Sequence, residues 1–269
     1  MSENAGMGIG GRWGPVRLPV VLRALTATIL TAAILRFVYW IVRLVRESPE
    51  SLGIDYRTLM TATNRWLDGG SFYGPWQLAG PYPLVGGPDI LYPPIALALF
   101  VPFTILPWIL WWAAPALIAA SALWRIRPRL VVLPLLALLF LYPRTQEVIL
   151  WGNPTMWVLA FALAGVAWGW PGALVLIKPT LLPFGLFGIR TRGWWVAAGA
   201  LGLVALVTLG LWSDWFTAIS NAYAASPLYS LIDVPTMCIA LVAAVGRTQR
   251  STQKPEAGPA GSGSLDSAQ

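Results

Sequence analysis

Few side chains in this sequence can carry out acid–base chemistry. The 269 residues include no histidine, one cysteine (Cys238) and 11 carboxylates. The commonest general base and the commonest metal ligand in proteins are therefore both missing. Proton transfer must fall to a carboxylate, a tyrosine or a lysine.

Asp55 is the first candidate among the carboxylates. It stands alone in the sequence Gly53-Ile54-Asp55-Tyr56, at the start of a predicted surface helix that follows the first apolar segment. A general base at the membrane surface is one interpretation. The other is a helix N-cap, a position that aspartate favours, and location alone favours the cap.

Three cations are candidates for binding an anion. Lys178 lies within an apolar segment, where a lysine is costly enough that a functional role is the default hypothesis. The alternative is that its side chain extends to the membrane interface. Arg57 and Arg144 are further candidates, but Arg57 also fits a surface charge on the predicted helix and Arg144 a cap on a membrane segment.

Long apolar stretches separate these residues. The chain is 57% apolar and 11% charged, whereas a soluble domain carries about 25% charged residues. The stretches that are long enough, or nearly so, to cross a bilayer are 20–45, 107–124, 129–143, 154–170, 172–189, 194–212 and 231–246, with a shorter one at 90–105. They do not alternate with period two, which favours helices. We expect an all-α, polytopic transmembrane helical bundle of about 7–8 membrane segments.

The basic residues predict the topology. The net charge is +7, but the charges lie between apolar segments, so they indicate orientation in the membrane and not nucleic-acid binding. Arg12, Arg17 and Arg23 place the N-terminus in the cytoplasm, although Arg43 and Arg46 flank the other end of the first segment. We expect that segment to be an uncleaved anchor in the plasma membrane.

The resulting organisation is one transmembrane domain, 1–246, followed by a disordered cytoplasmic tail, 247–269. Outer loops are expected at 46–106, 142–153 and 213–230. The first contains a predicted amphipathic juxtamembrane helix over 56–67, which ends at Asp68-Gly69-Gly70. A helix break is predicted at Lys178-Pro179.

Several motifs together resemble the GT-C membrane glycosyltransferases, in particular glycosyltransferase family 87, the polyprenyl-phosphate-mannose-dependent α-mannosyltransferases. The string Gly53-Ile54-Asp55-Tyr56 is followed by Gly69-Gly70-Ser71-Phe72-Tyr73 and by Tyr92-Pro93-Pro94, and Gly152-Asn153 and Lys178-Pro179 come later. The resemblance covers about residues 20–230. The chain departs from the pattern where the glutamine of the family's Gly-Gln-x-Asn site is missing.

The resemblance implies a function on the extracytoplasmic side. Asp55 would be the general base that activates an acceptor hydroxyl, and the sugar, mannose by resemblance, would come from a polyprenyl-phosphate-linked donor with inversion. Lys178, Arg57 and Arg144 would bind the donor phosphate. Tyr56, Tyr92, Glu147, Asn153 and Trp215 would contact the sugar or the lipid or glycan acceptor.

Three questions stay open at this level. Glu147 is a candidate to help Asp55 hold a divalent cation, but its position favours a solvated loop charge, and no metal site is assigned. A non-catalytic GT-C-like scaffold or lipid-glycan binding protein would share most of these motifs. A lipid transporter is a third class, but it would normally show inverted repeats, and none is seen.

Overall fold

The computed structural model describes residues 17–84, 89–223 and 229–247. Helices dominate, as the sequence predicts, and the one sheet in this part of the chain has two short strands, β1 and β2. In chain order the elements are α1 (Leu18–Glu47), η1 (Pro49–Ser51), α2 (Ile54–Leu67), α3 (Pro75–Ala79), β1 (Tyr82–Pro83), η2 (Pro94–Ala96), α4 (Leu97–Phe100), η3 (Val101–Thr104), α5 (Leu110–Ile126), η4 (Leu130–Val132), α6 (Leu133–Leu141), α7 (Pro143–Leu150), α8 (Thr155–Trp168), η5 (Trp170–Ile177), η6 (Pro179–Gly185), α9 (Arg192–Val207), η7 (Leu209–Leu211), α10 (Trp212–Asn221), β2 (Ala222–Tyr223), η8 (Tyr229–Asp233) and α11 (Val234–Val245).

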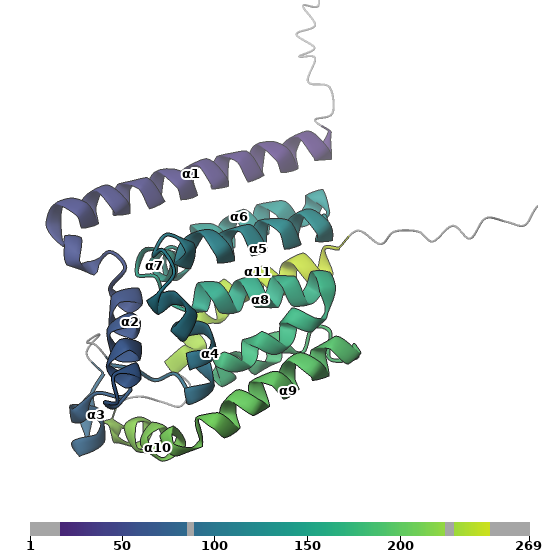
Figure 1. The fold of residues 1–269 in the computed structure, drawn as a ribbon. Helices are drawn as coiled ribbons and strands as arrows, with labels where there is room; N and C mark the ends of the chain where they lie inside the picture. The colour runs from purple at the N-terminus through teal and green to yellow at the C-terminus, as the bar shows by residue number, and fades with distance from the viewer. Residues whose placement is uncertain (1–16, 85–88, 224–228, 248–269) are drawn as a thin grey trace, which may run out of the picture.

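The long helices form a bundle, and α2 lies across one end of it (Figure 1). Helix α1 lies at one side of the bundle, next to α6, and α9 lies at the opposite side. Helix α8 lies between them and packs on α5, α11 and η5. Segments that are distant in sequence therefore meet at the end of the bundle that α2 covers.

Helix α1 is the one unbroken helix of the described residues that is long and apolar enough to cross a membrane. It has 30 residues, about 45 Å at 1.5 Å per residue. Up to three spans result if two bent pairs are each counted as one: α6 with α7, bent by 60°, and α9 with α10, bent by 71°. The all-α class and a membrane-competent helix are thus established, and the larger number of 7–8 segments stays a prediction.

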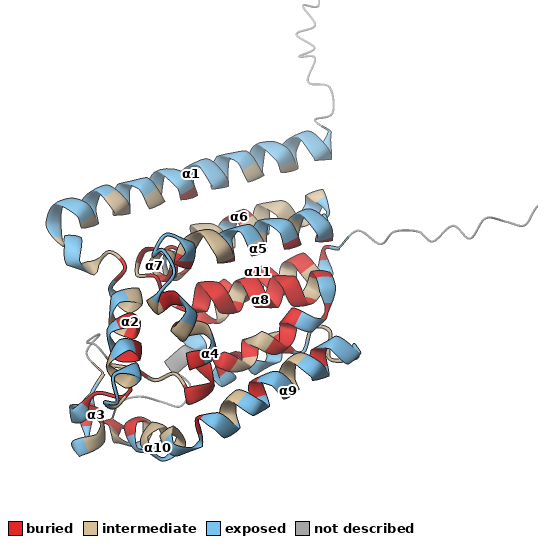
Figure 2. Cartoon of the chain, viewed as in Figure 1, coloured by how far each residue is buried: buried red, intermediate tan, exposed pale blue. Residues whose placement is uncertain are grey.

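The core of the bundle is α8, as Figure 2 shows by its almost continuous burial, in contrast to the exposed α1. Eleven of the 14 residues of α8 are buried. A helix that is apolar on all sides is expected to be enclosed by its neighbours. Gly165 permits a close approach, because a Cβ there would lie 2.8 Å from the Cα of Gly172 in η5.

Several expected boundaries differ from the structure. The predicted outer loop 142–153 contains helix α7, which begins at Pro143, a residue that suits the first helical position. The predicted segment 172–189 is two 3-10 helices, η5 and η6, which meet at Lys178, so the predicted break is confirmed there. Segment 194–212 does not end as one helix, because α9 stops at Val207 and α10 continues at a different angle. Of the predicted tail 247–269, all but Arg247 lies outside the described residues.

Candidate functional site

Asp55 is in the first turn of α2 but is not its N-cap. The cap is Gly53, whose φ of +69° belongs to the left-handed region that glycine tolerates. Its backbone N–H donates to the carbonyl of Leu150, and the N–H of Asp55 donates to the carbonyl of Trp151 at 2.9 Å. Carbonyl groups at the end of α7 thus accept the hydrogen bonds of the backbone N–H groups at the start of α2. The Asp55 carboxylate remains available for another partner.

That partner is Asn153. Its side-chain Nδ2 donates to Oδ2 of Asp55 at 2.7 Å. The orientation of the amide is fixed from the other side, because its Oδ1 accepts from the backbone N–H of Thr155 at 2.9 Å and from the hydroxyl of Tyr92 at 3.3 Å. Since N–H and O–H groups donate only to the oxygen of an amide, the nitrogen must face Asp55.

The loop that presents Asn153 is held tightly. Gly152 has φ +69°, and a Cβ on it would lie 2.8 Å from the ring of Trp112 and 3.0 Å from the Cβ of Tyr56. The indole N–H of Trp111 donates to the carbonyl of Gly152 at 2.7 Å. A glycine is therefore required between Trp151 and Asn153 for the loop to pass beneath α2.

A buried ionic group lies next to this pair. The Nζ of Lys178 is 2.7 Å from Oδ2 of Asp233 and donates to the hydroxyl of Thr155 at 2.8 Å. That hydroxyl in turn donates to Asp233 at 2.9 Å. The Nε of Arg144 is 2.8 Å from Oδ1 of Asp233. One carboxylate thus joins a cation of α7 to a cation between η5 and η6, with Lys178 3% and Asp233 1% exposed.

Two residues connect the ionic group to Asp55. Thr155 donates through its backbone to Asn153 and bonds through its hydroxyl to Lys178 and Asp233. The ring of Tyr92 lies 5.5 Å from the Nζ of Lys178, while its hydroxyl reaches Asn153. The polar chain is continuous from Asp55 through to Arg144.

The electrostatics of Asp55 reflect this setting. Burial raises the pKa of its carboxyl above the ordinary value of 3.8, and this is the largest effect. The hydrogen bond from Asn153 and the charges of Arg144 and Lys178 oppose the increase, while the charge of Asp233 adds to it. The net result is a raised pKa, which makes Asp55 a stronger proton acceptor than an exposed aspartate.

The sequence prediction assigned nine residues to the site, and the structure joins five of them in this network: Asp55, Asn153, Tyr92, Lys178 and Arg144. Glu147 lies at its edge, 3.8 Å from Arg144 and 40% exposed. Trp215 donates to the backbone of Leu91, beside Tyr92.

The other two residues lie elsewhere. The ring of Tyr56 packs against Trp111 and Trp112, with ring centroids 5.5 and 5.3 Å apart. Arg57 is exposed, and its guanidinium donates to the backbone carbonyls of Leu52 and Glu50. Arg57 is therefore on a different part of α2 from the Asp55 carboxylate.

Two members of the network, Thr155 and Asp233, are not assigned to the site from the sequence, although Asp233 is recognised there as a residue that either caps the last apolar segment or faces the cavity. Asp233 had a detectable signal, because a carboxylate just before an apolar segment is the natural partner for a lysine placed inside another one. Thr155 had none, since threonine is ordinary near the start of a helix. Within the described residues, no three His, Cys, Asp or Glu side chains gather to hold a metal ion.

Comparison with protein-family models, with curated proteins and with solved structures gives no match, so the assignment of function depends on the geometry of this network and on the sequence motifs.

Proposed function

We propose that this chain is a membrane glycosyltransferase of the plasma membrane. It transfers a sugar, mannose by resemblance to family 87, from a polyprenyl-phosphate-linked donor to a lipid or glycan acceptor on the extracytoplasmic side. Asp55 is the general base, and the reaction inverts the anomeric centre. The observation that carries the proposal is the continuous network from Asp55 through Asn153 and Thr155 to Lys178 and Arg144.

The chemistry needs one base and a group of cations. An acceptor oxygen attacks the anomeric carbon and forms the new glycosidic bond, and its proton passes to the Asp55 carboxylate. The bond between the anomeric carbon and the phosphate oxygen breaks, and its electron pair leaves with the lipid phosphate. That leaving group needs no protonation, so a single carboxylate is sufficient.

The negative charge that grows on the phosphate calls for cations nearby. Arg144 is the better placed of the two for direct contact, because its side chain is 16% exposed and that of Lys178 only 4%. Lys178 instead holds Asp233, which in turn holds Arg144. In this proposal Arg144 binds the phosphate and Lys178 supports it by charge and position.

The test is transfer from polyprenyl-phosphate sugars by purified protein in proteoliposomes. Asp55→Asn is expected to reduce kcat by about 10²–10⁴-fold, the usual contribution of a general base. Asp68→Asn is the matched control, because Asp68 is an exposed aspartate at the other end of the same helix. If the unaltered protein transfers from no lipid-linked donor, or if Asp55→Asn transfers equally well, the proposal fails.

A non-catalytic GT-C-like protein that binds lipid-linked glycans is the second candidate. One observation favours it: Asp233 already accepts hydrogen bonds from both cations. Such a protein would bind a polyprenyl-phosphate sugar with equal affinity before and after Asp55→Asn and would release no lipid phosphate. Measuring binding and phosphate release on the same two proteins separates the two functions.

A further inference from the structure

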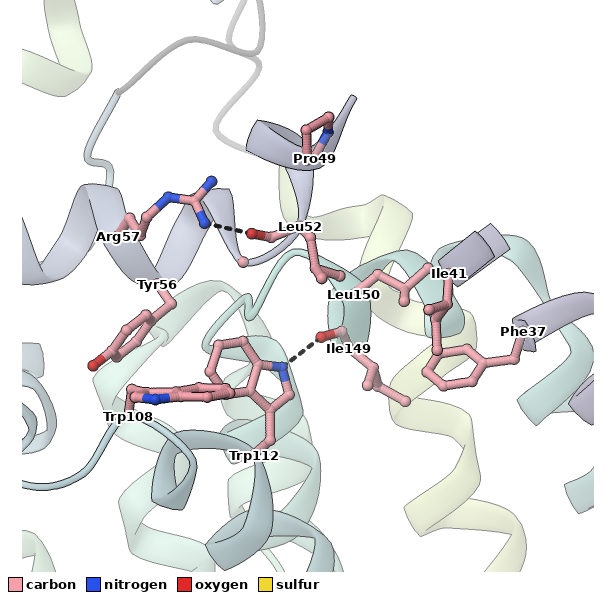
Figure 3. A pocket seen from close by; sticks show the side chains of 11 residues that line it. Phe37, Ile41, Pro49, Leu52, Tyr56, Arg57, Trp108, Trp112, Ile149 and Leu150 are labelled. Atoms are coloured by element: carbon pink, nitrogen blue, oxygen red, sulfur yellow. Dashed lines mark hydrogen bonds between the residues drawn. The ribbon is translucent and has the colours of Figure 1, made fainter. Parts of the chain in front are cut away.

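A cavity outside the Asp55 network lies between the outer end of α1 and the start of α2 (Figure 3). Its volume is about 530 Å³. Its walls are almost entirely apolar and include Phe37 and Ile41 of α1, Leu52, Trp108, Trp112 and Ile149. Among the described residues, helix α1 is the one unbroken helix that is long and apolar enough to cross a membrane, and in that position the α1 side of this cavity would face the bilayer.

The aromatic wall of the cavity is fixed in place. The indole N–H of Trp112 donates to the carbonyl of Ile149 at 2.8 Å, and the ring of Trp108 makes an edge contact with Trp112 at 5.9 Å (Figure 3). The ring of Tyr56 also packs against Trp112, with ring centroids 5.3 Å apart. The cavity is preformed, and Tyr56 and Trp112 stand between it and the loop of Gly152.

The lining contains a single charged residue, Arg57. Its guanidinium is held at the wall by two hydrogen bonds, to the carbonyls of Leu52 and Glu50. An arginine has five N–H donors, so these bonds orient the group and leave others for an anion. An apolar cavity with one oriented cation at its margin matches the two ends of an anionic lipid.

We infer that this cavity binds one hydrocarbon chain of an anionic membrane phospholipid, with the lipid phosphate at Arg57. The inference goes beyond the proposed transfer reaction, since the polar bonds of Arg57 run to Leu52 and Glu50 and those of Asp55 to Asn153. The hydrocarbon chain of the lipid gains apolar contacts, and its phosphate gains charge-assisted hydrogen bonds. The lipid would fill the space between α1 and α5 and fix the outer end of α1 against the bundle.

The test is native mass spectrometry of the full chain in detergent, titrated with dioleoylphosphatidylglycerol or with dioleoylphosphatidylcholine. The two lipids share their chains and differ in net charge. The unaltered protein is expected to take up one phosphatidylglycerol with about tenfold higher affinity than phosphatidylcholine, the size expected for hydrogen bonds to a charged group. Equal affinities would overturn the inference.

Two variants separate the contribution of the lipid hydrocarbon chain from that of the lipid headgroup. Arg57→Gln is expected to reduce the affinity for phosphatidylglycerol to that for phosphatidylcholine, and Ile41→Trp, which fills the cavity, is expected to weaken both. The matched controls are Arg46→Gln, an exposed arginine in the last turn of α1 that does not line the cavity, and Ile34→Trp, an exposed position of α1 outside the cavity. Equal loss in a variant and its control would contradict the site.

The same titration on the Asp55→Asn protein keeps this inference distinct from the transfer reaction, because lipid uptake needs no catalysis. We expect uptake there to match that of the unaltered protein. If Ile41→Trp instead raises the KM for the lipid-linked donor and leaves phospholipid uptake unchanged, the cavity belongs to the donor chain and the inference is wrong.

Discussion

The amide of Asn153 holds the carboxylate of Asp55 at 2.7 Å, across 98 residues of sequence. This one hydrogen bond joins the first turn of α2 to the loop that leads into α8. It also lowers the pKa of Asp55, against the larger effect of burial. Removal of this hydrogen bond should therefore have two separate consequences, one for kcat and one for the pH dependence of kcat.

Asn153→Ala should reduce kcat and move the acid limb of the pH–rate profile to higher pH. The pKa of Asp55 rises when the hydrogen bond that opposes burial is lost, so the base becomes protonated at a higher pH. A loss of kcat of about 10-fold or more fits a hydrogen bond to a charged group. Asn64→Ala, an exposed position on α2, is the control. A fall in kcat with an unmoved acid limb would argue that Asn153 acts only on structure.

Asp55→Asn should stabilise the protein at neutral pH while it lowers the rate of transfer. Because the pKa of Asp55 is raised above 3.8 in the folded state, folding favours the protonated form. The contribution of Asp55 to stability is present below the unfolded pKa and is lost as pH rises through the folded pKa. The Tm of Asp55→Asn should exceed that of the unaltered protein at pH 7, and the difference should disappear near pH 3. A lower Tm at pH 7 would contradict the raised pKa.

Asp233→Asn should be strongly destabilising, because it leaves Lys178 and Arg144 without their shared carboxylate. Removing one member of a buried ion pair costs about 3–5 kcal/mol. The double variant Lys178→Met with Asp233→Asn should recover part of that stability but no transfer activity. A double-mutant cycle by thermal unfolding measures the coupling, and additive effects of the two substitutions would refute it.

Gly152→Ala should destabilise the loop under α2 by about 1–3 kcal/mol, the range for a residue forced into a sparsely populated backbone conformation. The added Cβ would also meet Trp112 at 2.8 Å and displace the aromatic wall. Gly202→Ala in α9 is the control, since a Cβ there meets no atom within 4 Å. Thermal unfolding should show a loss for the first variant and a small gain for the second.

Cysteine labelling should place α2 outside the cell. In a Cys238→Ser background, Asn64→Cys should react with an impermeant maleimide added to intact cells. Arg190→Cys, at an exposed position between η6 and α9, should react only after permeabilisation. The reverse pattern would invert the proposed topology and would place Asp55 in the cytoplasm.

The sequence predicted the candidate base, the amphipathic helix after it and the break at Lys178, because each leaves a local signal: an isolated carboxylate, spaced apolar residues, and a lysine followed by proline. It could not predict that Arg144 and Lys178 share Asp233. Asp233 is 89 positions from Arg144 and 55 from Lys178 in the sequence. Both contacts depend on how α7 and α11 pack. The sequence predicts a loop in place of helix α7 because the segment carries several polar side chains. Two of these, Thr145 and Gln146, are buried by tertiary packing, which the sequence alone does not indicate.

Thr155 bonds to the two halves of the network with two different groups, its backbone to Asn153 and its hydroxyl to Lys178 and Asp233. It is also the first residue of α8, the helix enclosed most fully by its neighbours. A tilt of α8 would therefore displace both halves of the network together, so the Asp55 carboxylate, through Asn153, and the cations, through Asp233, would keep their spacing.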